Sequence, residues 1–82
     1  MKYFIFSSDM SYCINDEKNA LIQVVKNTEK CHLIVKNLSK EKSLLKTLDA
    51  SSDEITKQEF IEKVSKKTFS IILDILKINK NK

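Results

Sequence analysis

The first half of the chain alternates between short apolar runs and polar connections. The runs occupy residues 2–7, 11–15, 20–26 and 31–37, and they are rich in aromatic and β-branched side chains. The connections contain Asp, Asn, Ser and Thr, which favour tight turns. Short runs of this composition, separated by such turns, are typical of neighbouring antiparallel strands. The pattern therefore predicts an antiparallel β-meander over residues 1–37.

Residues 16–27 also fit a second interpretation, a helix that Asn15 or Asp16 could cap. The β-branched residues Ile22, Val24 and Val25 and the short flanking turns favour a strand. The helix remains the alternative, and it would make the first half of the chain βαβ-like. Its apolar side would be formed by Ala20, Leu21, Val24 and Val25.

A helical pattern begins after the meander. Over residues 39–48, Leu44, Leu45 and Leu48 share one side of a helix, and the Ser39 side chain can cap its first turn. The polar stretch that follows ends this helix. The spacing therefore predicts a short helix near residues 39–48.

The longest helical pattern starts at Asp53, which Ser52 can precede as the N-cap, and it reaches about residue 79. Such a helix would measure ~40 Å at ~1.5 Å per residue, longer than a domain of this size is wide. We therefore expect either a break near 66–68 or a projecting helix that meets a partner. Its apolar positions alternate by three and four residues, as in a coiled coil: Ile61, Val64, Thr68, Ile71, Ile75 and Ile78.

Together these elements predict an α+β protein with a single domain over residues 1–82. A meander of three or four strands over 1–37 is expected to pack against a long C-terminal helix. Residues 39–82 form the helical, basic half, which includes the short helix near 39–48. An 82-residue chain can bury only a limited core.

Composition places the positive charge in the second half. The formal net charge is +4, and residues 36–82 carry eleven Lys against seven acids, whereas residues 1–35 are balanced. Lysines can hold phosphates by releasing counterions, but without Arg the common bidentate contact to guanine is missing. We therefore expect either a solvated helix face or an anion-binding lysine patch, with further lysines at 40, 42 and 46. The lysine patch consists of Lys63, Lys66, Lys67, Lys77, Lys80 and Lys82.

The last helix is apolar around more of its circumference than one sheet face can cover. Core packing explains part of this surface, and contact with a partner or a second copy is the alternative. The candidate contact residues are Phe69, Ile71, Ile72, Ile75 and Ile78.

Catalytic chemistry has little support in the sequence. Cys31 and His32 are adjacent, but in a strand they point to opposite faces, so we expect Cys31 to be a small buried hydrophobe and His32 to be exposed. A zinc site from Cys13, Cys31 and His32 would lack a fourth ligand. The acid pairs at 16–17 and 53–54 fit turns and helix starts. We predict no enzyme activity and no catalytic, cofactor-binding or metal site.

No segment suggests export or membrane insertion. The apolar run after Lys2 is too short for a signal-peptide core, and the run over 69–78 contains Asp74 and Lys77. Two cysteines do not make a disulfide framework. We expect a cytoplasmic protein with reduced thiols.

The meander followed by the helix opening Glu54-Ile55-Thr56-Lys57-Gln58-Glu59-Phe60 resembles small lysine-rich accessory proteins of phages and mobile elements. Anti-CRISPR inhibitors are a group among them. The resemblance implies a non-enzymatic protein in a bacterial or phage-infected cell. It also implies that the partner is a larger protein or ribonucleoprotein, such as a CRISPR nuclease effector or its guide RNA.

The leading hypothesis is thus a small inhibitor or binding protein that grips its target with lysines and the apolar helix. One alternative is a homo-oligomeric regulatory or immunity-type protein that dimerises through the C-terminal helix. Another is a small RNA-binding module, in which aromatic side chains on an open sheet face would stack on bases. The aromatic candidates are Tyr3, Phe4, Phe6 and Tyr12.

Overall fold

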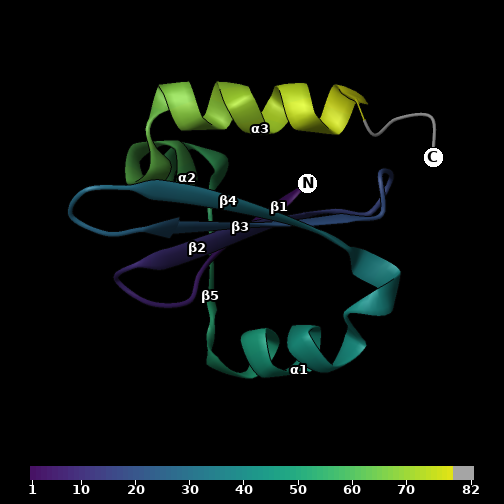
Figure 1. Cartoon of the computed structure of the whole chain (residues 1–82). Coiled ribbons are helices and arrows are strands. Elements are labelled where there is room, and N and C mark those ends of the chain that lie inside the picture. The colour runs from purple at the N-terminus through teal and green to yellow at the C-terminus, as the bar shows by residue number, and fades with distance from the viewer. Residues whose placement is uncertain (79–82) are drawn as a thin grey trace.

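The computed structural model, which describes residues 1–78, contains a five-stranded antiparallel sheet between two layers of helices (Figure 1). The strand order is β4-β3-β2-β1-β5, and every neighbouring pair is antiparallel. This confirms the α+β class, with five strands where three or four were predicted. The elements are β1 (Lys2–Ile5), β2 (Met10–Asn15), β3 (Ala20–Lys26), β4 (Cys31–Asn37), the 3₁₀ helix η1 (Leu38–Lys40), α1 (Lys42–Ser51), β5 (Asp53–Ile55), α2 (Lys57–Val64) and α3 (Lys66–Ile78).

The central strand β3 settles the choice for residues 16–27 in favour of a strand. Ile22 and Val24 point to the upper face of the sheet, toward α2 and α3, while Leu21 points to the lower face, toward α1. A helix could not distribute these neighbours to opposite sides in strict alternation. Asn19 makes the turn before β3 with a left-handed φ of 53°, which Asn tolerates better than most residues, in a chain without Gly.

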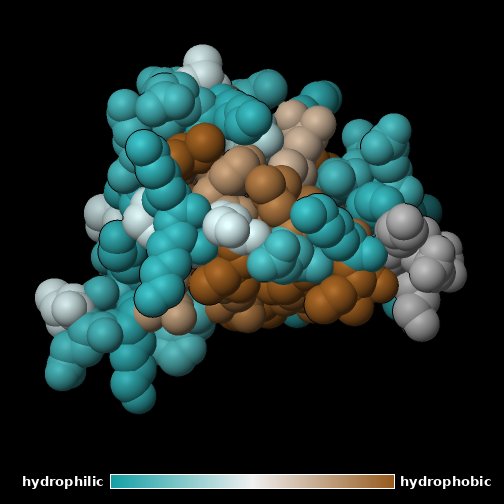
Figure 2. All heavy atoms as spheres, turned by 90° about the horizontal axis from the view of Figure 1, so that it is seen from above, coloured by the Kyte–Doolittle hydropathy of each residue, from teal (hydrophilic) through white to brown (hydrophobic). Residues whose placement is uncertain are grey.

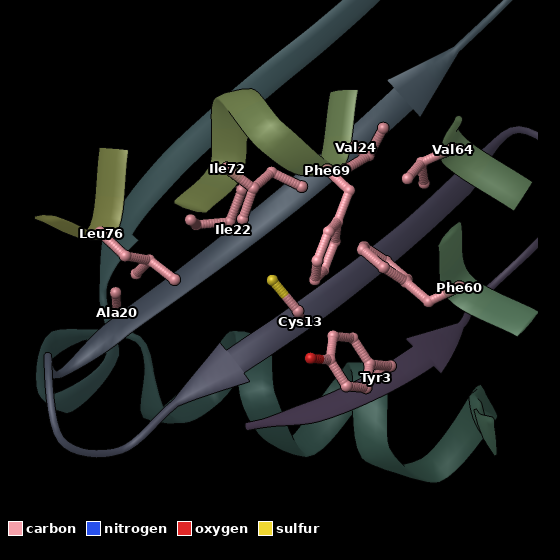
Figure 3. Packing of buried hydrophobic residues seen from close by; sticks show 10 residues of the cluster. All are labelled: Tyr3, Cys13, Ala20, Ile22, Val24, Phe60, Val64, Phe69, Ile72 and Leu76. Carbon is pink, nitrogen blue, oxygen red and sulfur yellow. The ribbon is translucent and has the colours of Figure 1, made fainter. Parts of the chain in front are cut away.

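The upper core joins three strands to α2 and α3. Tyr3, Phe60 and Phe69 form an aromatic cluster, with ring centroids 5.0 Å apart for Tyr3 and Phe60 and 6.2 Å apart for Phe60 and Phe69. Figure 3 shows these rings beside the Cys13 thiol, with Ile72 above Ile22. Burial of such side chains removes most apolar area from water, so this layer contributes most of the hydrophobic stabilisation. The cluster consists of Tyr3, Cys13, Ala20, Ile22, Val24, Phe60, Val64, Phe69, Ile72 and Leu76.

The lower core is smaller and lies between the sheet and the layer of η1 and α1 below it (Figure 1). Phe4 and Tyr12 stack with ring centroids 4.8 Å apart, and they pack with Leu21 and Leu48. The predicted helix over 39–48 is therefore real but has different limits, because Asn37 caps η1 through its side chain and α1 continues to Ser51.

The predicted start of the long helix at residue 53 is wrong. Residues 53–55 form β5, which pairs with β1, and α2 begins only after Thr56. Thr56 and Glu59 make a reciprocal capping box, in which the Glu59 amide donates to the Thr56 hydroxyl at 3.1 Å and the Thr56 amide donates to the Glu59 carboxylate at 2.8 Å. Thr56 therefore replaces Ser52 as the helix cap.

A second break lies at Ser65, close to the predicted position. Ser65 has φ 91° and ψ 154°, a backbone conformation that is almost confined to Gly. Its amide closes α2 on the Ile61 carbonyl at 2.7 Å, and its hydroxyl accepts from the Thr68 amide at 3.2 Å and so caps α3. The bend returns α3 across the sheet, and the whole structure measures 33 × 28 × 23 Å.

We expect Ser65→Gly to stabilise the protein, since Gly relieves a backbone strain of about 1–3 kcal/mol and the lost N-cap costs only a few tenths when Gly replaces it. A net gain of ~1 kcal/mol would raise the melting temperature by about 4–8 °C. Ser65→Ala keeps the strain and loses the cap, so its melting temperature should fall by a similar amount. Thermal unfolding followed by circular dichroism measures both, and a Gly variant less stable than the wild type would contradict this account.

Candidate functional site

The predicted contact residues of the last helix separate into two groups. Phe69 and Ile72 are buried in the upper core with Leu76, so their predicted role as partner contacts is wrong. Ile71 is 42% exposed, Ile78 is 77% exposed, and Ile75 is half-buried. The predicted coiled-coil line also fails, because it crosses the break at Ser65 and its member Val64 is buried.

The orientation of α3 places its exposed isoleucines beside β4. The Thr68 hydroxyl lies 4.0 Å from the Cys31 thiol at the start of β4. Thr68, Ile71, Ile75 and Ile78 lie three or four residues apart and therefore share one side of the helix. That side faces the edge of the sheet, whereas the buried side faces β3.

The edge strand β4 continues this apolar surface. Leu33 and Val35 are the partners of Val24 and Ile22, so their side chains point to the upper face, where Val35 remains 42% exposed. Figure 2, which looks down on the helix layer, shows hydrophobic residues gathered in a band along one side of this face. We call this region the β4–α3 surface, and it consists of Leu33, Val35, Ile71, Ile75 and Ile78.

Only part of the lysine patch forms a common surface. Lys66, Lys67 and Lys77 are exposed on the half of α3 that faces away from the core, and we call them the outer lysines. Lys63 is half-buried on α2 and lines a hollow of about 220 Å³ with Asp9 and other residues of the β2 and β3 ends. Lys80 and Lys82 lie outside the described residues.

Two of the three outer lysines are unfavourably placed for the helix itself, whereas Lys77 lies in the last turn, where a cation is favourable. Lys66 and Lys67 occupy the first turn of α3, which contains no acid. Cations at a helix N-terminus oppose the macrodipole, at a cost of a few tenths of a kcal/mol each on an exposed surface. Asp74 lies on the same outer side. Helix stability therefore does not explain this placement.

The two cysteines occupy opposite environments. Cys13 is buried in the upper core, and this burial raises the pKa of its thiol to about 12, so the thiol stays protonated at neutral pH. Cys31 is exposed, and the prediction that it is buried is wrong because β4 is an edge strand. His32 is exposed as predicted, and it points to the face of β4 opposite Cys31.

A nucleic-acid platform of stacked aromatics is not formed by the predicted residues. Tyr3, Phe4 and Tyr12 are buried, Tyr3 on the upper face and the other two on the lower face. Burial raises the pKa of both tyrosines. Phe6 is 36% exposed and stands without the other three. This finding overturns the structural basis of the small RNA-binding module.

A hollow of about 330 Å³ lies between the lower face and α1. Leu38, Leu45 and the stacked rings line its floor, and charged residues surround it at Lys2, Asp16, Lys46 and Asp49. The sequence pattern predicted the apolar side of the 39–48 helix, which includes Leu45. It did not predict the hollow, because the distance of α1 from the sheet depends on tertiary packing. The open edge of β4 was missed for the same reason.

Within residues 1–78, no group of three or more His, Cys, Asp or Glu side chains is close enough to hold a metal ion. No helix in this part of the chain has the length and hydrophobicity that crossing a membrane requires. Searches of protein-family models, curated proteins and solved structures found no match to the chain.

The cysteine environments predict a difference in reactivity. In the native protein at neutral pH, a thiol reagent should modify Cys31 quickly and leave Cys13 unmodified, since reaction requires an accessible thiolate. In denaturant both thiols should react. Titration with a chromogenic disulfide measures this, and the Cys31→Ser variant serves as the control. If the native Cys31→Ser variant reacts with the reagent as fast as the wild type, Cys13 is accessible and the prediction is wrong.

Proposed function

We propose that the protein is a small, non-enzymatic binding protein that inhibits or modulates a larger nucleoprotein by holding its phosphate backbone. The observation that carries this proposal is the exposed position of Lys66, Lys67 and Lys77 on the outer side of α3. Two of these lysines occupy a helix turn that they destabilise, which is typical of residues retained for binding an anion.

The chemistry of these side chains favours phosphate over base recognition. Each lysine is a point charge on a flexible stem, and the chain contains no Arg. Phosphate contacts of this kind give affinity that depends on salt and carries no sequence information. The proposed ligand is therefore the backbone of an RNA or DNA strand held by a larger protein, such as a guide RNA in a nuclease effector.

The polar side chains of the described residues support a non-enzymatic role. The buried Cys13 thiol has a pKa raised away from the range in which it would act as a nucleophile. The exposed Cys31 has His32 as its neighbour in sequence, but their side chains lie on opposite faces of β4. The arrangement offers a binding surface and no paired nucleophile and base.

The alternative, a homo-oligomeric regulatory protein, is favoured by a different observation, the exposed apolar β4–α3 surface. The two proposals are compatible because the surfaces differ. Lys66 and Lys77 lie on the solvent side of α3, the isoleucines Ile71, Ile75 and Ile78 lie toward β4, and Lys67 lies at the border between the two.

The proposal predicts a local effect of charge removal. The triple variant Lys66→Gln, Lys67→Gln and Lys77→Gln should bind a fluorescent single-stranded RNA more weakly. The slope of log K against log salt should become less negative by about 2, since each phosphate contact to a single strand contributes ~0.7. Fluorescence anisotropy at several salt concentrations measures the slope.

A matched control removes the same charge elsewhere. Lys40, Lys42 and Lys46 are exposed on η1 and α1, on the opposite side of the sheet from α3 (Figure 1). Their replacement by Gln changes the net charge equally and should leave the slope near its wild-type value. Equal losses in the two triple variants, or no loss in the first, would overturn the proposed binding face.

A further inference from the structure

We propose that the β4–α3 surface binds a second copy of the chain, with β4 of one protomer pairing antiparallel to β4 of its partner around a two-fold axis at Ile34. This inference goes beyond the proposed function and does not depend on it. The argument starts from the two edges of the sheet.

The two edge strands differ in how they are protected. β5 has three residues, and it begins with Asp53 and Glu54, whose charges discourage pairing with another strand. β4 has seven residues, and its upper face carries only uncharged side chains, while its lower face carries one charged residue, Lys36. Long, uncharged edges are templates for a further strand, and monomeric proteins usually protect them. β4 is therefore the edge at which the sheet can continue.

The hydrogen-bond ladder shows which groups of β4 remain free. The Leu38 amide donates to the Asn19 carbonyl at 2.9 Å, and the Asn27 amide donates to the Lys30 carbonyl at 3.0 Å. Both bonds belong to the β3–β4 register, so the even-numbered residues of β4 direct their backbone groups toward β3. The odd-numbered residues direct theirs toward the open edge. They are Cys31, Leu33, Val35 and Asn37.

This free edge is complementary to itself. A two-fold axis at Ile34 pairs Leu33 with Val35 of the partner subunit and Cys31 with Asn37 of the partner subunit. All odd-numbered residues then exchange backbone hydrogen bonds, and a shift by two residues would leave some of them unpaired. On the upper face, the central pairs of this interface consist of the apolar Leu33 and Val35, and the end pairs consist of Cys31 and Asn37. On the lower face Ile34 lies opposite its own copy. His32 lies opposite Lys36 of the partner subunit, and a neutral His32 does not repel this lysine.

The helices fit the same axis. α3 runs parallel to β4, because Thr68 contacts Cys31 at the start of the strand while Leu76 packs beside Ala20, the register partner of Asn37 at its end (Figure 3). Ile34 lies midway between Cys31 and Asn37, so its level corresponds to the middle of the stretch from Thr68 to Leu76, near residue 72 of α3.

The exposed isoleucines then meet their counterparts. The axis passes close to Ile71, so the two copies of Ile71 lie nearest to each other, and Ile75 lies next along the same side of each helix. An antiparallel edge pairing puts both α3 helices on the same face of a continuous sheet, about 10–14 Å apart given strand spacings of ~4.8 Å. Isoleucine side chains from both helices span such a gap. The centre of the side of α3 that faces the axis carries Thr68, Ile71 and Ile75, and Lys67, four residues before Ile71, lies at its margin.

The first test is the solution mass with a matched pair of variants. The wild type should give about twice the chain mass of 9.5 kDa by light scattering at micromolar concentration. Ile71 and Leu73 are 42% and 39% exposed on different sides of α3, and only Ile71 lies on the β4–α3 surface. Ile71→Lys should weaken the dimer at least tenfold, while Leu73→Lys should leave it intact.

The second test reads the register. In a Cys31→Ser background, Ile34→Cys should form a disulfide with its own copy when oxidised glutathione accepts the two electrons and leaves as two reduced molecules. A non-hydrogen-bonded pair at the axis has Cα atoms ~4.5 Å apart, within disulfide range. His32→Cys in the same background is the control and should stay monomeric on a non-reducing gel.

The outcomes separate this inference from the proposed function. A monomeric wild type, or loss of the dimer in Leu73→Lys but not in Ile71→Lys, would overturn the dimer at this surface. A His32→Cys disulfide without an Ile34→Cys disulfide would overturn the register. If the protein binds RNA as a monomer, the proposed function is supported and only the proposed dimer is overturned.

Discussion

The structure depends on one constraint, the central strand β3, whose side chains are buried on both faces. Ala20, Ile22 and Val24 need cover above the sheet, and Leu21 needs cover below it. One helix layer can satisfy only one face, so the second half of the chain must supply both. α1 covers the lower face, β5 carries the chain past β1, and α2 and α3 cover the upper face. In this arrangement β4 remains at one edge of the sheet.

This constraint explains why the last helix is divided. A continuous helix from residue 53 would exceed the 33 Å long axis of the molecule and could contact the sheet over only part of its length. Bending at Ser65 lets Phe60 and Phe69 converge on Tyr3 from two helices. The aromatic cluster offsets the strained backbone of Ser65, since burial of its three rings together contributes more than that strain costs.

The sequence was sufficient for features set by local pattern and insufficient for those set by strand order. The limits of β3 and β4 were predicted correctly because apolar runs and turn residues mark them. β5 was missed because its two acids also suit a helix start, and only pairing with β1 makes it a strand. Among the candidate contact residues, the broadly apolar composition of the last helix grouped Ile71 and Ile78 with the buried Ile72. Which of them faces the core depends on where α3 lies over the sheet.

The two surfaces of α3 are related by the geometry of the sheet. In the proposed dimer the two-fold axis stands perpendicular to the sheet, so both α3 helices and their outer lysines lie on the same side. A phosphate backbone that contacts one set of lysines then has a second set within reach, which raises affinity through effective concentration without any new kind of contact. The open edge of β4 and the weakly basic helix therefore reinforce each other. An isolated chain offers few charges, and pairing through the edge doubles them on one face.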